Sequence, residues 1–266
     1  PRAARRRFER AARSYPGASR LEAEVAARML ERLDYVKLAP RRILDAGSGP
    51  AREARALAAR YRGALIAAAD FSLGMLQSER GWLRRNPSIP LCARLERLPL
   101  AADTFDLAWS NMALHCVPEP LEALKELHRV LAPGGLVMFS TLGPDSLKEL
   151  RTAAGAERVH AFLDMHDIGD MLVAAGFSAP VMDMELLTFT YASGAALLAD
   201  LRASGQTSVR RDRARGLAGG RFLKRLQERL PPRATFEVVY GHAWKGAARA
   251  KRDEPVKTIG IFKRLP

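Results

Sequence analysis

Two carboxylates and a turn of small residues stand where they could bind a nucleotide-like ligand. An apolar run that ends at Leu44 is followed by Asp45, Gly47, Ser48 and Gly49. Glycine permits a tight turn and a close approach of the backbone to a ligand. The next residues predict a helix, and a strand, a glycine turn and a helix N-terminus in this order form a nucleotide-sized site in open α/β sheets. Taken alone, the pattern fits an ordinary strand-to-helix turn equally well.

The second carboxylate, Asp70, lies where a ribose-binding residue is expected. The run 64–69 predicts a buried strand that ends in Asp70. A carboxylate at the end of the second strand, about 20 residues after the glycine turn, can accept hydrogen bonds from both hydroxyls of a ribose. We therefore expect Asp70 and the glycine turn to bind one ligand at the same edge of the sheet.

Strands and helices are expected to alternate through the first half of the chain. The expected strands are a run ending at 44, then 64–69, 90–93, 105–110 and 136–141, with helices at 51–62, 72–85 and 118–131. Pro50 is well tolerated at the start of the first helix, and Ser72 is a suitable N-cap for the second. This alternation predicts an α/β fold with a mostly parallel sheet and helices on both faces.

The pattern divides the chain into three parts. Residues 1–38 are expected to form N-terminal cap helices, at 1–15 and 19–38, with a break at Pro16 and Gly17. Residues 39–142 form the ligand-binding α/β core. Residues 143–266 complete the core and contain a helical lid, roughly 143–165 and 192–231. In this last part we expect helices at 146–154, 167–175, 193–203 and 220–230, and strands at 181–191, 234–244 (antiparallel, at or near the sheet edge) and 257–262.

Composition narrows the class of protein. The 266 residues are 48% hydrophobic, which is ample for the core of one α/β domain with a lid. Cys92 and Cys116 are too few for a disulfide framework or a metal site, so we expect a reducing, cytoplasmic environment. No apolar run is long enough to span a membrane, and no signal peptide is visible.

The net charge of +14 predicts an acidic partner. Nucleic acid, an anionic membrane surface and an acidic protein all fit this charge, and a general preference for arginine is the alternative explanation. Nucleic acid is the weaker candidate because few aromatic residues are interleaved with the arginines. The segment 202–229 has many arginines and few acids, and it is the best candidate for a partner-docking surface.

Two later features extend the motif. Asn111 follows the strand 105–110, and a Pro-Gly-Gly turn at 133–135 precedes the strand 136–141. Together with the glycine turn and Asp70, this order resembles the class I S-adenosylmethionine (SAM)-dependent methyltransferases, whose motif is Asp-x-Gly-x-Gly-x-Gly. The resemblance implies a class I methyltransferase Rossmann-like fold, with SAM as the cofactor.

Longer stretches carry a closer and more specific resemblance. They include Phe-Glu-Arg-Ala-Ala-Arg-Ser-Tyr at 8–15, Ser-Asn-Met-Ala-Leu-His at 110–115, Ser-Thr-Leu-Gly-Pro-Asp-Ser-Leu-Lys-Glu-Leu-Arg at 140–151 and Phe-Glu-Val-Val-Tyr-Gly-His-Ala-Trp at 236–244. Through them, nearly the whole chain resembles the malonyl-acyl carrier protein (malonyl-ACP) O-methyltransferases of biotin biosynthesis, the BioC family. This implies a SAM-dependent transferase that methylates the free carboxylate of malonyl-ACP, with an acidic carrier protein bearing malonyl-phosphopantetheine as its partner.

The resemblance also implies site residues. The expected cofactor site consists of Asp45, Gly47, Ser48, Gly49, Asp70, Phe71, Met75, Leu95 and Asn111. Phe71 and Met75 would pack on the adenine or belong to the core. Asn111 would contact the methionine part of SAM or the substrate, or serve as a turn residue.

Three further residues are candidates for the substrate side. Tyr15 would close over the cofactor or pack a helix. Arg151 and His160 would bind the malonyl carboxylate or the phosphopantetheine, or lie as ordinary surface residues. No side chain is assigned a catalytic role, because a malonyl carboxylate is ionised at neutral pH and can attack the methyl group directly. Such a reaction needs positioning, exclusion of water and a cation rather than a general base.

Several positions depart from the family pattern. Ala51 replaces the third glycine, where a methyl group is tolerable if the residue is already helical. Arg94, a donor-only side chain, replaces an aspartate expected to accept from the adenine amino group, and Glu96 would substitute if the loop shifts. His115 and Cys116 replace a Gln-Trp pair. The alternatives are thus a methyltransferase for another small acid or RNA, and a non-catalytic assembly factor with weakened SAM binding.

Overall fold

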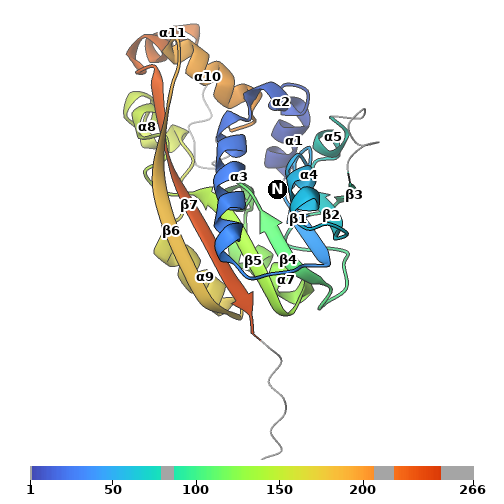
Figure 1. Ribbon diagram of the computed structural model, residues 1–266. Helices are drawn as coiled ribbons and strands as arrows, with labels where there is room; N and C mark the ends of the chain where they lie inside the picture. The colour runs from blue at the N-terminus through green and yellow to red at the C-terminus, as the bar shows by residue number, and fades with distance from the viewer. Residues whose placement is uncertain (1, 79–86, 207–218, 247–266) are drawn as a thin grey trace, which may run out of the picture.

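The computed structural model describes residues 2–78, 87–206 and 219–246. Its centre is a seven-stranded sheet in the order β3-β2-β1-β4-β5-β7-β6 (Figure 1). The strands are β1 (Arg42–Ala46), β2 (Leu65–Asp70), β3 (Ser88–Cys92), β4 (Phe105–Ser110), β5 (Leu131–Leu142), β6 (Phe177–Thr190) and β7 (Arg233–Lys245). β1 to β5 pair in parallel, whereas β7 is antiparallel to both β5 and β6. The expected mostly parallel sheet is confirmed, and the antiparallel strand near the edge is β7.

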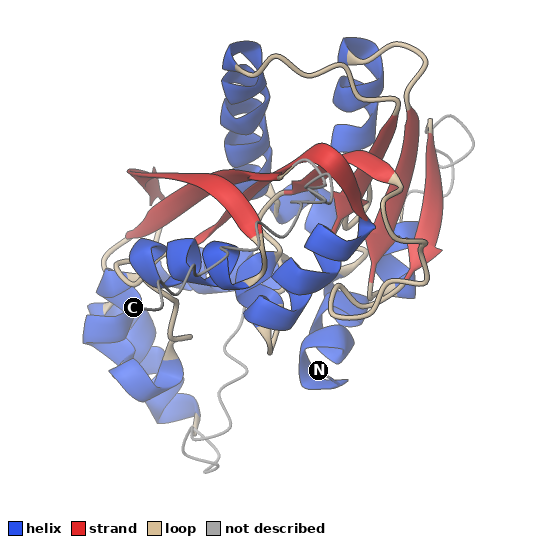
Figure 2. Ribbon diagram, turned by 90° about the horizontal axis from the view of Figure 1, so that it is seen from below, coloured by secondary structure: helices blue, strands red, loops and turns tan. Residues whose placement is uncertain are grey.

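Alternating residues of the central strands face two separate cores. Ile43 and Leu107 face one core, and their neighbours Leu44 and Ala108 face the other. The first core is covered by α3 (Arg20–Arg32) and α4 (Glu53–Arg60), and the second by α7 (Pro120–Val130) and α9 (Met165–Ala174). Figure 2 shows helices on both sides of the sheet. The two-sided burial explains why the central strands are apolar at successive positions.

The N-terminal helices are α1 (Arg2–Ala11), α2 (Tyr15–Ala18) and α3. We expected a break at Pro16 and Gly17, and this was wrong: Pro16 lies in the first turn of α2. There its missing N–H removes no helical hydrogen bond. α1 packs beside α5 (Leu73–Gln77), and the rings of Phe8 and Phe71 meet edge to face with 5.6 Å between centroids.

The segments expected to form a lid contain helices. They are α8 (Lys148–Ala154), the 3-10 helix η3 (Ala156–Arg158), α10 (Gly194–Ala203) and α11 (Gly220–Arg229). Glu149 fixes α8 to β7, because its carboxylate accepts hydrogen bonds from the N–H (3.0 Å) and hydroxyl (2.6 Å) of Thr235. Burial opposes ionisation of Glu149, but these bonds hold its pKa below the ordinary value. The three-part division and the lid role of these helices stay predictions.

Several boundaries differ from the expected ones for local reasons. The helix expected from residue 51 begins at Glu53, because Ala51 has a left-handed backbone (φ 56°) and is not helical. The Pro-Gly-Gly turn falls within β5, where the pairing with β4 shifts register. α3 ends at Arg32, where the 3-10 helix η1 (Leu33–Tyr35) follows.

Two expected elements reach past the described residues. The strand 257–262 and the later part of the helix 72–85 lie outside them. Ser72 does cap α5, since its hydroxyl accepts from the N–H of Met75 (3.1 Å). Within the described ranges, no helix combines the length and the apolar composition needed to cross a membrane.

Candidate active site

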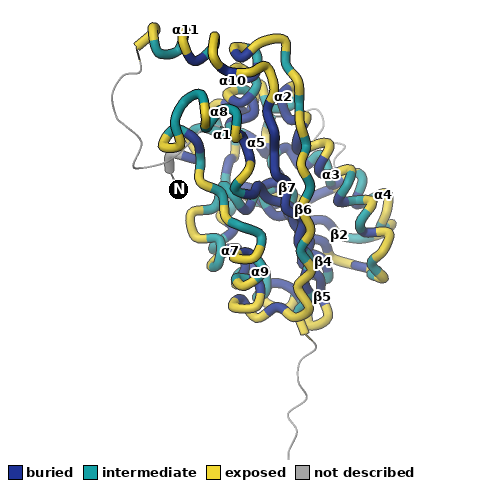
Figure 3. Tube along the Cα trace, turned by 90° about the vertical axis from the view of Figure 1, so that its left-hand side faces the viewer, coloured by how far each residue is buried: buried dark blue, intermediate teal, exposed yellow. Residues whose placement is uncertain are grey.

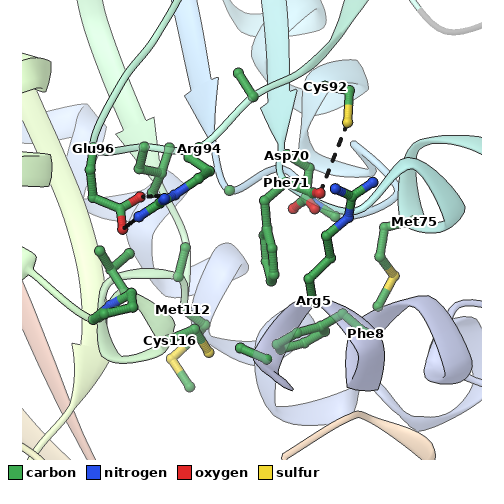
Figure 4. A pocket seen from close by; sticks show the side chains of 18 of the residues that line it. Arg5, Phe8, Asp70, Phe71, Met75, Cys92, Arg94, Glu96, Met112 and Cys116 are labelled. Carbon is green, nitrogen blue, oxygen red and sulfur yellow. Dashed lines mark hydrogen bonds and ion pairs between the residues drawn. The ribbon is translucent and has the colours of Figure 1, made fainter. Parts of the chain in front are cut away.

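A cavity of about 340 Å³ opens at the carboxyl ends of β1, β2 and β4. β1 lies between β2 and β4, so this is the point where successive strands diverge to opposite sides of the sheet. Ligands of open α/β sheets bind at such switch points, in pockets of roughly 300–1,000 Å³. Figure 4 shows side chains from the sheet edge and from α1 converging on this cavity.

The glycine turn forms the floor of the cavity. Gly47 has φ 77°, its N–H donates to the Ala69 carbonyl (2.7 Å), and a Cβ added to it would lie 2.3 Å from the Cβ of Ala113. Gly49 has φ 54° and also lines the cavity. Both positions therefore need glycine, as the motif predicts, and they leave room for a ligand against the backbone.

Asp70 lines the cavity and anchors the turn. Its carboxylate accepts from the N–H of Gly49 (2.9 Å) and from the N–H of Ser72 (2.7 Å). Burial raises its pKa to about 6, although these two hydrogen bonds work in the opposite direction. An ionised carboxylate has about four acceptor positions, so two remain for the hydroxyls of a ribose.

Apolar side chains form the walls of the cavity. Phe71, Met75 and Leu95 line it, as expected, and Met75 is also part of the buried interior. Phe8 and Arg5 of α1 line it as well, and we did not assign them to the site. The sequence predicts a helix over 1–15, but it does not tell which element that helix contacts.

Arg94 and Glu96 both line the cavity and form an ion pair (2.7 Å). The Glu96 side chain is only 12% exposed, whereas that of Arg94 is 54% exposed. The Arg94 side chain has only hydrogen-bond donors, and Glu96 supplies acceptor oxygens beside it in the cavity. The replacement of an aspartate by Arg94 therefore leaves an acceptor in the cavity.

A second, smaller cavity of about 30 Å³ lies beside the first and is lined by carboxylates. Glu22 comes from α3, Asp45 from β1 and Glu53 from α4. Asn111 joins these elements: its amide donates to the Glu22 carbonyl (2.9 Å) and to the Glu53 carboxylate (3.4 Å). One carboxylate oxygen of Asp45 and the Ser48 hydroxyl are buried with no hydrogen-bond partner among the described residues.

The electrostatics of this carboxylate chamber (Glu22, Asp45 and Glu53) favour a cation. Burial, and then neighbouring carboxylates, raise the pKa of Glu22 to about 7 and the pKa of Asp45 well above its ordinary value. Burial also raises the pKa of Glu53. The described residues contain no metal-binding group of His, Cys, Asp or Glu. An organic ammonium group fits this chamber, because it would supply both charge and hydrogen-bond donors.

Of the three substrate-side candidates, Tyr15 lines the cavities, whereas Arg151 and His160 do not. Tyr15 lines both cavities and approaches Gly49, so it lies over the expected cofactor position. Arg151 donates to the Ser146 carbonyl (3.3 Å), and His160 packs on the ring of Phe162. Neither Arg151 nor His160 lines the two cavities, and their contact with substrate stays a prediction.

Comparison with known proteins identifies the family. Residues 44–139 match the model of the methyltransferase domain Methyltransf_11. The malonyl-[acyl-carrier protein] O-methyltransferase of Methylovorus sp. (strain MP688) is 47% identical, over 92% of this chain and 89% of that one. The protein of the same name from Gallionella capsiferriformans (strain ES-2) is 48% identical, over 94% and 93%. The chain belongs to the malonyl-ACP O-methyltransferase family.

Solved structures show the same fold at lower identity. The YcgJ protein of Bacillus subtilis has a TM-score of 0.62 at 16% identity and covers 84% of this chain and 99% of its own. A phosphoethanolamine N-methyltransferase of Haemonchus contortus, solved with S-adenosylhomocysteine, has a TM-score of 0.53 at 19% identity, covering 83% and 52%. The fold is that of the class I SAM-dependent methyltransferases, as expected, and SAM is the cofactor of this family. The glycine floor, the free acceptor positions of Asp70 and the carboxylate chamber fit its adenosine and ammonium groups.

We predict that Gly47→Ala strongly weakens SAM binding. The new Cβ would collide with Ala113 on a backbone that L-residues rarely adopt, so the turn must move into the cavity. Isothermal titration calorimetry should show affinity weakened by about a hundredfold or more, the loss of two to three kcal/mol of contacts. Gly63→Ala is the matched control, because Gly63 has φ 84° but nothing within 4 Å. Equal weakening in both variants would contradict the role of the turn.

We predict that SAM binds about tenfold more tightly at pH 8 than at pH 6. Glu22 has a pKa of about 7, so it is mostly protonated at pH 6 and ionised at pH 8, and only the ionised form attracts an ammonium group. Glu22→Gln should bind SAM weakly at pH 8 and lose most of this pH dependence in calorimetry. Glu24→Gln is the control, since Glu24 is on the same helix but exposed and paired with Arg28. An unchanged pH profile in Glu22→Gln would show that the carboxylate chamber does not bind the ammonium group of SAM.

Proposed function

We propose that this protein transfers the methyl group of SAM to the free carboxylate of malonyl-ACP. The observation that carries the proposal is the 47–48% identity, across more than nine-tenths of the chain, to proteins named for this reaction. The cavity supports it, because its glycine turn, the carboxylate of Asp70 and its apolar walls suit SAM. The product would be a neutral methyl ester, which in the BioC family serves biotin biosynthesis.

The proposed role of the site residues is to bind and orient. Asp70 accepts from the ribose, the walls around Phe71 and Leu95 hold the adenine, and the carboxylate chamber holds the ammonium group. When bound, SAM supplies an electrophilic methyl group on its sulfonium sulfur. Tyr15 and α1 line the cavity, and their cover over a bound SAM would exclude water, which strengthens the interactions inside it.

The acceptor needs no general base. Its carboxylate is ionised at neutral pH, so the attacking oxygen already carries charge. The protein must hold the two reactants in line, a contribution that positioning alone can make large.

The proposed partner is an acidic acyl carrier protein, and α11 is the surface that fits it. Arg221, Lys224, Arg225 and Arg229 are exposed and share one face of this helix with a single acid, Glu228. Figure 3 shows α11 exposed at one end of the molecule, next to α10. The structure therefore presents a cationic face within the segment 202–229, part of which lies outside the described residues. Opposite charges on two surfaces accelerate their encounter.

The purified protein should methylate malonyl-ACP. With labelled SAM, we expect incorporation into malonyl-ACP, a slower reaction with malonyl-CoA, and none with RNA. Label on RNA or on free small acids instead would favour another methyltransferase. Failure to bind SAM in calorimetry at high micromolar concentration would favour a non-catalytic assembly factor.

Charge reversal on α11 should affect the carrier-bound substrate alone. We expect Lys224→Glu with Arg225→Glu to raise KM for malonyl-ACP about tenfold while leaving KM for malonyl-CoA within twofold, because only the carrier protein contacts the helix. The difference should shrink at high salt.

The matched control reverses two other exposed cations. Lys37 and Arg62 lie in loops that lead into β1 and β2, at the amino ends of these strands and opposite the cavity. Lys37→Glu with Arg62→Glu changes the net charge equally and should leave both KM values unchanged. An equal rise of KM in both double variants would show that net charge, not α11, attracts the carrier.

A further inference from the structure

The turn after β4 places a histidine beside the cofactor cavity. In the 3-10 helix η2 (Leu114–Cys116), Cys116 lines the cavity, whereas His115 does not and packs edge to face on Phe162 (5.8 Å between centroids). The ring of His160 packs on the same Phe162 ring, with 5.2 Å between centroids. His115 thus lies between the cavity and the segment that follows α8. Met112 and Cys116, which follow β4, line the cavity apart from Asp70 (Figure 4), and we assign this side of the cavity to the acceptor.

The ring of His115 is chemically unsatisfied. Both nitrogens are buried, and neither has a partner in hydrogen-bonding geometry among the described residues. The amide of Gln206 is next to the ring, and it donates to Glu22 (3.1 Å). A buried polar group without a partner costs free energy, and such groups are uncommon in folded proteins. A ligand that offers an oxygen to this ring would remove the cost.

The ring is also neutral. Burial, and then the neighbouring His160, lower the pKa of His115 to about 4, while the contact with the Gln206 side chain acts in the other direction. At physiological pH one ring nitrogen therefore donates a hydrogen bond and the other accepts. A neutral donor can hold one oxygen of a carboxylate without an ion pair, so the second oxygen keeps its negative charge for the attack.

We propose that His115 donates a hydrogen bond to the malonyl carboxylate, at the oxygen that does not attack, and so selects acceptors that carry a carboxylate. The inference rests on the proposed function. In the reaction, the free oxygen forms the O–CH₃ bond as the S–CH₃ bond breaks. The electron pair of that bond returns to sulfur, the sulfonium becomes a neutral thioether, and no proton moves. His115 is thus a residue that determines acceptor specificity.

The test measures acceptor affinity in His115 variants. We expect His115→Leu to raise KM for malonyl-ACP by about tenfold to a hundredfold, the usual effect of losing a hydrogen bond to a charged group. Its SAM affinity should stay within twofold, and it should be at least as stable as the parent, because an apolar side chain replaces an unsatisfied one. His115→Gln keeps an N–H donor and should restore KM to within about threefold.

Butyryl-ACP, which lacks the carboxylate, separates the inference from a general effect on the carrier. His115→Leu should leave its inhibition constant against malonyl-ACP turnover unchanged. His128→Leu is the matched control, because His128 packs edge to face on Phe177 (5.0 Å) away from the cavity. It should leave every kinetic constant unchanged.

Two results would overturn the inference. One is an unchanged malonyl-ACP KM in His115→Leu, and the other is an equal loss of malonyl-ACP and butyryl-ACP affinity, which would place His115 on the thioester or the carrier. A parent enzyme that binds SAM but does not methylate malonyl-ACP would instead contradict the proposed function.

Discussion

Burial of several carboxylates beside one another is the constraint on which the site depends. Asp45 and Asp70 end adjacent strands, and Glu53 starts the helix between them, so the strand–turn–helix geometry itself places like charges together. Their raised pKa values express the cost of this arrangement. The two apolar cores on either side of the sheet offset that cost, and the resulting chamber has a lining of carboxylates that suits a cationic ligand.

The N-terminal helices complete what the sheet begins. α3 is anchored in the first core by Val25 and Met29, and this fixes Glu22 over the glycine turn. Asn111 then connects α3, α4 and the end of β4 through its amide, and Ser140 of β5 donates to its carbonyl oxygen (2.9 Å). The site is therefore held by four elements at once.

The departures from the family pattern have local physical consequences. Ala51 takes a left-handed backbone, so it carries strain that a glycine would not, and its buried methyl group packs in the first core. Arg94 is turned into one half of an ion pair whose other half, Glu96, stays in the cavity. Ala51 lines neither cavity, and Glu96 keeps acceptor oxygens in the larger one. The geometry therefore favours an enzyme over a scaffold with weakened SAM binding.

The sequence by itself determined three features: the alternating apolar runs, a turn that requires Gly47, and a carboxylate at the end of β2. These are local features, because backbone sterics and side-chain periodicity act over a few residues. The left-handed Ala51, the first turn of α2 at Pro16 and the ion pair of Arg94 depended on neighbours and were not foreseen. Only the tertiary structure brought Phe8 to the larger cavity and Glu22 to the smaller one beside it, since helix packing joins residues far apart in the chain. A periodic pattern tells which face of a helix is buried, but not what it is buried against.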